Sequence, residues 1–360
     1  MKHFNKLLLL FAVFSLLLSS CDDDHSYVPV ISDVPCAVVV NQGAMGYLPG
    51  TLDVLNLTDG TYTPTVLTLG GSPQNVAECG GYLFVPLFEE DAVAVYDKSS
   101  LRAAGRIAVP APQNVCTDGE RIFAVGADSI FRISASSLSV ELKDTVGHTA
   151  FAAVCSGGSV YVSIGRGLGQ AEGGNLVAKV NPETLQREYI SVGINPYNQM
   201  VADDEAGVFV VCTGNYYDIL PAVYRIKADG IATEVCAGTY IDVCDGKLFV
   251  VERNSSYDSN WNETSSCTYK VYNANTGSLL AEDFIKADAE HPAAATFVKV
   301  NPNSGDIYVG AAGLTDGGFV NYMGSADVRY RYASDGSMLG KYEAGVSPYA
   351  LYFVTKRVAE

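Results

Sequence analysis

The residues that could carry acid–base or metal chemistry are few in this chain and far apart in the sequence. Three histidines lie beyond the first 20 residues, at His25, His148 and His291, and no His-Glu-x-x-His pair, clustered His/Cys set or EF-hand loop accompanies them. This spacing predicts no dedicated metal site, and we expect no cofactor. Asp242 or His148 could act as a base in a lyase or lactonase, but no carboxylate pair is spaced for coupled acid and base roles. The sequence therefore favours a protein that is not an enzyme.

The composition excludes several classes of function. The chain has 360 residues, of which 48% are hydrophobic and 18% charged, so it can bury a sizeable core. Its formal charge is -17 at pH 7. Such a surface repels phosphate backbones and anionic lipid headgroups, so we expect no nucleic acid partner and no polybasic contact with a membrane. The 35 glycines and 22 tyrosines, against one tryptophan, favour many short strands joined by tight turns.

The amino-terminal segment has the pattern of an export signal. Two lysines precede the apolar run Leu7–Leu18, which is too short to cross a bilayer, and Cys21 then follows Leu-Ser-Ser, as at a lipoprotein signal-peptidase site. We expect residues 1–20 to be removed, Cys21 to carry the lipid, and residues 21–35 to form a tether. The three aspartates after Cys21 resemble the export tag of Bacteroidetes lipoproteins. The sequence thus predicts an outer-membrane lipoprotein that faces the cell exterior, with a periplasm-facing lipoprotein as the alternative.

Seven similar segments recur along the rest of the chain. Each begins with a turn rich in Gly or Pro and continues into a short apolar strand. They are Gly70–Cys79, Pro110–Cys116, Gly147–Cys155, Gly193–Ala202, Gly238–Cys244, Glu290–Val300 and Gly345–Val354. A tight turn and further β-branched strands follow each of the first six. Four short strands per unit, repeated seven times, predict an all-β, seven-bladed β-propeller over residues 36–360.

The seventh segment has no further strands after it. Three strands at the other end of the propeller region, Cys36–Gly43, Gly50–Gly60 and Thr63–Gly70, have no innermost strand of their own. We therefore expect one blade to be shared between the amino-terminal and carboxy-terminal strands. Such a blade closes the ring without leaving an exposed edge.

Long insertions are predicted on only one face of this ring. The turns that lead into the innermost strands and the turns between the second and third strands open on the same face. The long segments all belong to the second of these classes and are residues 44–49, 87–91, 166–174, 215–221, 253–267 and 312–327. Because scaffolds present recognition residues on loops, we expect a ligand on this face, which we call the long-loop face.

Aromatic and amide side chains gather on the predicted long-loop face. Aromatic platforms beside neutral amides suit a large, polar, roughly planar ligand such as a corrinoid or a glycan. The alternative for each residue is packing between blades, since Tyr is common in strands. The candidate ligand-binding residues are Gln74, Asn75, Phe88, Gln113, Asn114, His148, Phe151, Arg166, Tyr197, Asn198, Asn215, Tyr216, Tyr217, Asp218, Tyr257, Trp261, His291, Phe319, Tyr322 and Tyr349.

The cysteines beyond Cys21 follow the repeat. Cys79, Cys116 and Cys155 end the innermost strands of successive units. Recurrence at one blade position is typical of small buried hydrophobic residues, so we expect mostly free thiols. Cys236 and Cys244 could bridge adjacent strands, and the sequence alone does not give the connectivity.

Two segments resemble a known family. Asn41–Asn56 (NQGAMGYLPGTLDVLN) and Thr213–Ile226 (TGNYYDILPAVYRI) are similar to segments of YncE-like propellers among the surface lipoproteins of Bacteroidetes. The resemblance covers nearly the whole chain after Cys21, but its motifs are mainly structural. The family includes surface proteins that capture cobamides and hand them to a TonB-dependent outer-membrane transporter, on which they sit as a lid.

This resemblance implies a function for the long-loop face. It implies a surface lipoprotein that binds a cobamide such as cobalamin non-covalently and delivers it to a TonB-dependent transporter. The second matched segment makes Asn215, Tyr216 and Asp218 the first loop to test. Two alternatives remain open, a glycan-binding protein of a polysaccharide-uptake system and a propeller lyase or hydrolase.

Overall fold

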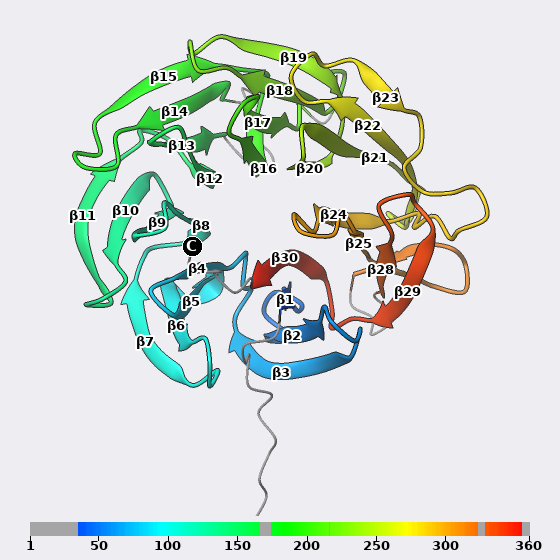
Figure 1. Ribbon diagram of the computed structural model, residues 1–360, viewed down its shortest axis with the longest axis horizontal. Coiled ribbons are helices and arrows are strands. Elements are labelled where there is room, and N and C mark those ends of the chain that lie inside the picture. Colours follow the sequence, from blue (N-terminus) through cyan, green and yellow to red (C-terminus); the bar gives the residue numbers. More distant parts are fainter. Residues whose placement is uncertain (1–34, 166–173, 216, 323–327, 355–360) are drawn as a thin grey trace, which may run out of the picture.

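Seven four-stranded antiparallel sheets are arranged as a ring, which confirms the predicted seven-bladed β-propeller (Figure 1). The computed structural model describes residues 35–165, 174–215, 217–322 and 328–354. Three predicted site residues, Cys21, Arg166 and Tyr216, lie outside these ranges. Within them, no helix has the length and apolar character needed to span a bilayer.

Each blade has four strands in the same order from the centre of the ring to its rim. The innermost strands are β4 (Ala77–Cys79), β8 (Pro112–Thr117), β12 (Ala150–Ser156), β16 (Pro196–Asp203), β20 (Tyr240–Cys244), β24 (Ala295–Val300) and β30 (Pro348–Val354). The second strands are β5 (Tyr82–Leu87), β9 (Arg121–Gly126), β13 (Ser159–Ile164), β17 (Gly207–Cys212), β21 (Lys247–Tyr257), β25 (Ile307–Ala311) and β1 (Cys36–Asn41).

The outer two strands of each blade complete the sheets. The third strands are β6 (Ala92–Asp97), β10 (Ser129–Ser134), β14 (Leu176–Val180), β18 (Ala222–Ile226), β22 (Glu263–Asn273), β28 (Val328–Tyr332) and β2 (Gly50–Asn56). The fourth strands are β7 (Ala103–Ala108), β11 (Ser139–Thr145), β15 (Arg187–Ser191), β19 (Ala232–Ala237), β23 (Leu279–Ala281), β29 (Met338–Glu343) and β3 (Tyr62–Gly70).

The core lies between neighbouring blades. Both faces of a blade are covered by its neighbours, so the second strands are largely buried within the ring; every residue of β1 (CAVVVN) is buried. Phe84 and Val95 of one blade, for example, pack in a cluster with Val115 and Ile122 of the next. The fourth strands form the rim, and β11 (SVELKDT) has no buried residue. The run of Val and Ile in each unit therefore follows from its position within the blade.

The two ends of the chain share one blade, as predicted. Strand β1 pairs antiparallel with β30, with Cys36 opposite Val354 and Val38 opposite Tyr352. This sheet has the order β3-β2-β1-β30, so the carboxy-terminal strand is its innermost member. Backbone hydrogen bonds between the two ends of the chain therefore close the ring.

A buried ion pair reinforces the closure. Arg329 of β28 lies 2.5 Å (Nη2 to Oδ2) from Asp53 of β2, and the exposed fractions of the two side chains are 4% and 0%. The same Asp53 oxygen accepts a hydrogen bond of 2.6 Å from the Asn41 side chain, and its other oxygen accepts one of 2.7 Å from the Thr65 backbone. Tyr62 also donates to Asp53. This cluster joins the last complete blade to the amino-terminal strands.

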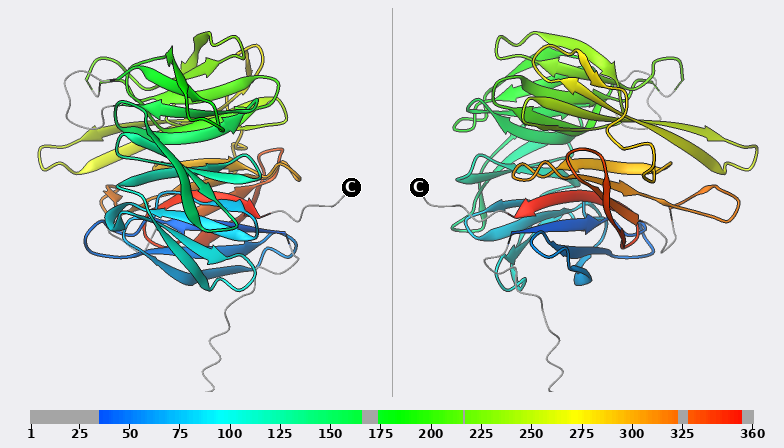
Figure 2. Two further views of the ribbon diagram at one scale, coloured as in Figure 1. Left: turned by 90° about the vertical axis from the view of Figure 1, so that its left-hand side faces the viewer. Right: turned by 45° about the vertical axis from the view of Figure 1, so that its right-hand side comes forward.

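The turns sort onto two faces as predicted. The segment leading into β4 forms a bridge with the end of β5, Pro73 to Leu87, so the two classes of turn lie side by side. The β21–β22 hairpin projects from the long-loop face, whereas β30 ends on the opposite face (Figure 2). Because Cys36 is paired with Val354, the amino-terminal end of the ring also lies on that opposite face.

One predicted loop is wrong. Residues 253–267 were expected to form an insertion, but β21 and β22 continue through most of it as two strands of 11 residues each. The register runs without a break from Lys247 opposite Asn273 to Tyr257 opposite Glu263, and only residues 258–262 form the turn. Shorter elements occur in two other insertions, the 3-10 turn η1 (Phe88–Glu90) and the pair β26 (Gly313–Leu314) and β27 (Val320–Asn321).

Candidate functional site

Amide side chains line the central channel near the long-loop face. They lie where the innermost strands begin, because the repeated segments carry Gln and Asn just after their turns. The cavity there has a volume of about 160 Å³. The polar and aromatic residues that line it are Gln74, Asn75, Gln113, Asn114, Gln199, Phe297, Lys299 and Tyr349.

Several of these amides connect neighbouring blades. The Asn75 side chain donates to the carbonyl of Val115 at 2.8 Å and accepts from its N–H at 2.9 Å. Asn114 makes the equivalent contact one blade further, accepting from the N–H of Ala153 at 3.3 Å. These two residues therefore satisfy backbone groups between innermost strands. Gln113 belongs to the same lining, at the start of β8.

The charged groups of the channel are paired. Asp242 is buried, and its Oδ1 lies 2.8 Å from Lys299 Nζ while its Oδ2 accepts from the Val300 N–H at 2.7 Å. Both carboxylate oxygens are thus used between β20 and β24. A carboxylate held in this way is poorly placed to act as a general base.

The two histidines lie away from the channel lining. His148 is exposed on the turn before β12. His291 Nε2 is 3.0 Å from Asp283 Oδ2, its Nδ1 is 2.9 Å from the Ala289 carbonyl, and its ring lies 5.9 Å from that of Tyr269. The described residues contain no group of three or more His, Cys, Asp and Glu side chains that could hold a metal ion.

A buried network supports the β21–β22 hairpin. Arg253 Nη2 lies 2.6 Å from Glu263 Oε1, and both side chains have an exposed fraction of 5%. Ser255 donates to Glu263 at 2.6 Å and Tyr322 donates to its other oxygen at 2.6 Å. The guanidinium of Arg253 also donates to the Ala295 carbonyl at 3.1 Å. The network therefore joins the hairpin to the neighbouring blade.

The network holds its groups in fixed charge states. Burial alone would raise the pKa of Glu263, but hydrogen bonds from Ser255 and Tyr322 and the charge of Arg253 outweigh it and lower the pKa below its usual value. Burial, together with the hydrogen bond to Glu263, raises the pKa of Tyr322. At neutral pH Glu263 is thus ionised and Tyr322 is a protonated donor.

The tip of the hairpin presents two exposed aromatic rings. The side chains of Trp261 and Tyr257 have exposed fractions of 82% and 57%, and their ring centroids lie 6.2 Å apart. Asp258 fixes the turn, since its Oδ1 accepts from the N–H groups of Asn260 at 2.8 Å and Asn262 at 2.9 Å. Trp261 has a φ of 64°, which is unfavourable for a bulky residue and is typical of functional positions.

A second exposed aromatic group lies on the loop of residues 215–221. Asn215 Oδ1 accepts from the backbone N–H groups of Tyr217, Asp218 and Ile219 at 2.9–3.1 Å, and its amide donates to Asp218 at 2.6 Å. Asn215 and Asp218 therefore hold the loop, whereas Tyr217 is 90% exposed. Gly214 is required next to them, because a Cβ there would lie 1.8 Å from the Ile219 carbonyl.

An apolar cavity of about 280 Å³ lies beneath this loop. Ile219, Leu220 and Tyr224 of β18 are among the residues that line it. These three residues were not among the predicted ligand-binding residues, although the apolar Ile219 and Leu220 within a predicted loop were a visible signal. It likewise missed Arg253 and Glu263, because the segment that holds them was read as a loop.

Exposed apolar side chains gather on the long-loop face. More than half of the large ones in the described residues lie there, and the rest lie on or next to the fourth strands at the rim. Those on the long-loop face are Met45, Tyr47, Leu48, Tyr217, Ile219, Leu220, Tyr257, Trp261, Leu314 and Tyr322.

The other predicted residues are less exposed. Phe88, on η1, and Phe319 are half-buried. Phe151 is buried and its ring lies 4.4 Å from that of Tyr197, so this pair packs between two blades. Asn198 belongs to β16, and its side chain is not described. The predicted set therefore divides into channel amides, inter-blade packing and the exposed aromatic residues of the loops.

The charge state of Glu263 gives a testable pH dependence. Because its folded pKa is below the unfolded value of about 4.3, the ion pair contributes stability above that pH and loses it as the pH falls through the folded pKa. We expect acidification below about pH 4 to open the hairpin. Hydrogen exchange of the β21 and β22 amides, followed as a function of pH, measures this opening.

The variant Glu263→Gln isolates this effect. At neutral pH it leaves the buried Arg253 without its counter-charge, and we expect the free energy of opening the hairpin to fall by about 3 kcal/mol. Hydrogen exchange of the β21 and β22 amides measures this loss. Ser256→Ala on the same hairpin is the control, because the Ser256 side chain shares its hydrogen bond with the hydroxyl of exposed Thr264 and takes no part in the Arg253–Glu263 network. Equal exchange in Glu263→Gln and Ser256→Ala would contradict the assignment.

Comparison with known proteins supports the fold and nothing finer. No family model and no curated protein matches the chain. Among solved structures, a quinoprotein alcohol dehydrogenase-like protein of Bacteroides thetaiotaomicron superposes with a TM-score of 0.58 at 15% identity, covering 90% of this chain and 79% of the other.

Two further structures show how varied the similar proteins are. A candidate 6-phosphogluconolactonase of Bacteroides fragilis has a TM-score of 0.58 at 13% identity, covering 91% of this chain and 99% of that one. Hydrazine synthase of Kuenenia stuttgartiensis has a TM-score of 0.59 at 12% identity, covering 80% and 96%. Propellers of this type are thus shared by proteins of different activities, and the function has to be argued from the site.

Proposed function

We propose that this protein binds a large polar small molecule non-covalently on the long-loop face, with a cobamide as the leading ligand, and delivers it to a TonB-dependent outer-membrane transporter. The observation that carries the proposal is the concentration of exposed aromatic side chains on that face, with Tyr47, Tyr217 and Trp261 each more than 80% exposed. Exposed rings held on ordered turns are typical of binding surfaces.

The ligand lies across the loops rather than inside the channel. The channel cavity, at about 160 Å³, is smaller than the 300–1,000 Å³ of ordinary small-molecule pockets. A corrin ring with its side-chain amides exceeds it by far. The corrin ring therefore rests on the aromatic side chains of the loops, and only a polar substituent of the ligand reaches Gln113 and Gln199 at the mouth of the channel.

The arrangement of the polar groups in and near the channel favours binding without catalysis. Of the two candidate bases, Asp242 is engaged with Lys299 and the Val300 N–H, whereas His148 is exposed and lies outside the channel lining. A lyase or hydrolase needs an acid and a base within reach of the same bond. An anionic substrate is disfavoured as well, because the channel cation Lys299 is paired with Asp242 and the formal charge is -17.

The position of the chain ends suits an anchored receptor. The amino-terminal end of the ring lies opposite the long-loop face, so a lipid anchor on Cys21 leaves the aromatic residues accessible. The segment from Cys21 to Pro35 can span at most about 50 Å. That reach allows the ring to turn its binding face toward a transporter in the same membrane. The cobamide and the transporter come from the resemblance to YncE-like surface lipoproteins.

A glycan is the second candidate. The Tyr257–Trp261 pair at the hairpin tip favours it, since the apolar faces of sugar rings stack on exposed aromatic rings. A glycan would use the same face without needing the channel amides.

Calorimetric titration of the chain from Ser26 onward, which contains every described strand, separates the two candidates. We expect tight one-to-one binding of cyanocobalamin and no heat with a panel of glycans. If only a glycan gives heat, the ligand is a glycan rather than a cobamide, and the long-loop face remains the proposed binding surface. No heat with cyanocobalamin at micromolar protein contradicts the cobamide proposal.

A further inference from the structure

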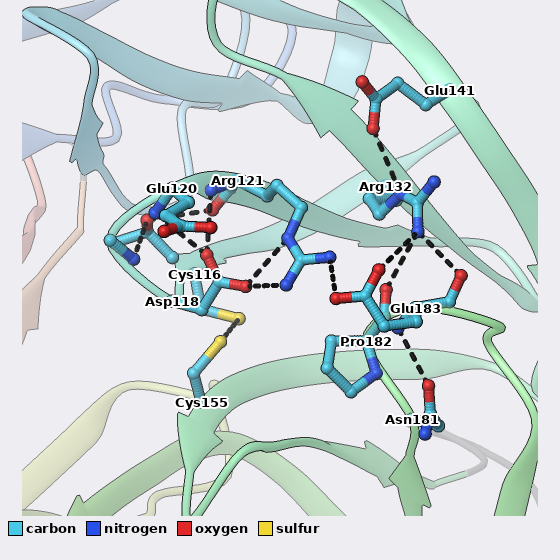
Figure 3. A network of polar contacts seen from close by, with 12 residues as sticks. Cys116, Asp118, Glu120, Arg121, Arg132, Glu141, Cys155, Asn181, Pro182 and Glu183 are labelled. Carbon is cyan, nitrogen blue, oxygen red and sulfur yellow. Dashed lines mark hydrogen bonds and ion pairs between the residues drawn. The ribbon is translucent and has the colours of Figure 1, made fainter.

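Two cysteines face each other between neighbouring blades. Cys116, in β8, and Cys155, in β12, have their sulfur atoms 3.5 Å apart (Figure 3). All eight cysteines among the described residues are free thiols in this structure, and both members of this pair are half-buried. A disulfide bond requires a separation of about 2.05 Å. The two sulfur atoms therefore have to approach by roughly 1.5 Å.

The interface between these blades is held on both sides of the pair. Near the channel, the Asn114 side chain accepts a hydrogen bond of 3.3 Å from the Ala153 N–H. Asn114 and Ala153 each precede the cysteine of their own strand by two residues. Further out, Arg121 Nη1 lies 2.6 Å from Glu183 Oε1 across the same interface (Figure 3). Because contacts on both sides hold the two blades at a constant distance, the thiols remain neighbours in the folded state.

A small molecule can reach one of the two thiols. Cys155 forms part of the wall of a cavity of about 330 Å³ on the face opposite the long loops. Asp118, Arg121 and Ser156 also line this cavity. Its volume is within the range of small-ligand pockets. An oxidant that enters it meets Cys155 first and Cys116 behind it.

We propose that Cys116 and Cys155 form a redox-active dithiol site. Small-molecule disulfides, or dithiol–disulfide oxidants with an exposed disulfide, oxidise the two thiols to a disulfide bond that joins the second and third complete blades of the chain. The Cys155 thiolate attacks one sulfur of the oxidant, forms a mixed disulfide and releases one thiol. Cys116 then loses its proton, attacks Cys155 Sγ and releases the second thiol. Two protein thiols are oxidised and one disulfide of the oxidant is reduced.

The order of the two attacks follows from the surroundings of the thiols. The hydrogen bond to Cys155 and burial raise the pKa of Cys116, so this thiol stays protonated in the reduced pair. It becomes the resolving thiol, because it lies next to the mixed disulfide once this has formed. The bond closes a loop between positions 39 residues apart and ties β8 to β12 at the end away from the ligand face.

Oxidation of the reduced chain from Ser26 onward by oxidised glutathione tests the site. We expect the mass to fall by two hydrogen atoms, the number of titratable thiols to fall by two, and tryptic mapping to yield one linked peptide pair containing Cys116 and Cys155. The bond should raise the melting temperature by roughly 5 °C, and dithiothreitol should reverse the shift.

Matched variants connect the shift to this pair. Cys116→Ser and Cys155→Ser should abolish it, whereas Cys244→Ser should retain it, since Cys244 ends the innermost strand of another blade in the same way. Peptide mapping of the wild-type chain decides the matter even if a variant folds poorly. Unchanged thiol counts after prolonged oxidation, or a linked peptide that joins other cysteines, overturns the proposal.

Discussion

Replacing Asp53 by alanine is expected to lower the free energy of unfolding by about 3–5 kcal/mol, the largest effect on stability of any single change considered for this ring. The substitution leaves Arg329, whose side chain is 4% exposed, as a buried charge without a partner. It also removes one of the two acceptors of the Asn41 amide and the acceptor of the Thr65 backbone N–H.

The effect is large because Asp53 joins segments from the two ends of the chain. Asp53 and Arg329 are 276 residues apart, and their contact spans the interface where the shared blade meets the last complete one. Burial raises the pKa of Tyr62, so this phenol stays protonated and donates to Asp53. Without Asp53, the pairing of β1 with β30 alone would have to keep the ring closed, so the closure is weaker.

Equilibrium unfolding in urea measures the loss, with Glu188→Ala as the control. Glu188 pairs with Lys179 at 3.3 Å on the rim, where the glutamate side chain is 69% exposed. Removing such a surface pair should cost less than about 1 kcal/mol. The double variant Asp53→Leu with Arg329→Met should recover part of the stability, because it leaves no unpaired buried charge. A loss for Asp53→Ala as small as that for Glu188→Ala would show that the ring does not depend on this ion pair.

The sequence predicted the ring because each blade repeats the same burial pattern. The predicted segments Gly70–Cys79 and Gly238–Cys244, for example, end at the same residues as the innermost strands β4 and β20. The shared blade was predictable too, since the last repeat had an innermost strand and the first strands had none. These features depend on local pattern and on the position of turns, both of which a single sequence contains.

The extended hairpin was not predictable in the same way. Its outer half reads Arg-Asn-Ser-Ser-Tyr and Glu-Thr-Ser-Ser-Cys, a polar composition typical of loops. It forms strands because Arg253 and Glu263 meet across the hairpin and continue the register of the blade. A contact between side chains ten residues apart decides the local structure, and that contact becomes visible only once the fold is known.

The channel amides show a second limit. Asn75 and Gln74 are adjacent in the sequence and were both candidates for ligand binding. In the ring, Asn75 bonds to the backbone of the next blade, and Gln74 bonds to Ser72 of its own turn at 3.0 Å. Residue type alone does not distinguish an amide that satisfies backbone groups from one that is available to a ligand.

Replacing Trp261 by alanine is expected to weaken ligand binding by about 10- to 100-fold, the size usual for an aromatic residue at the centre of a binding surface. The Trp261 side chain is 82% exposed and lies at the hairpin tip, so its removal should change the free energy of unfolding by less than about 0.5 kcal/mol. Loss of affinity without loss of stability would separate a role in binding from a role in the fold.

Calorimetric titrations of Trp261→Ala and of Tyr189→Ala with cyanocobalamin, run in parallel, compare the affinities of the two variants. Tyr189 is a half-exposed aromatic residue on the rim strand β15, and its removal should leave the affinity unchanged. In the wild-type chain a bound corrin should also quench the fluorescence of Trp261, since the chromophore absorbs where tryptophan emits. If Trp261→Ala binds normally while Gln113→Ala weakens binding, the ligand sits at the channel mouth and the hairpin contributes to another contact. The pair of variants therefore locates the ligand on the ring whichever compound it proves to be.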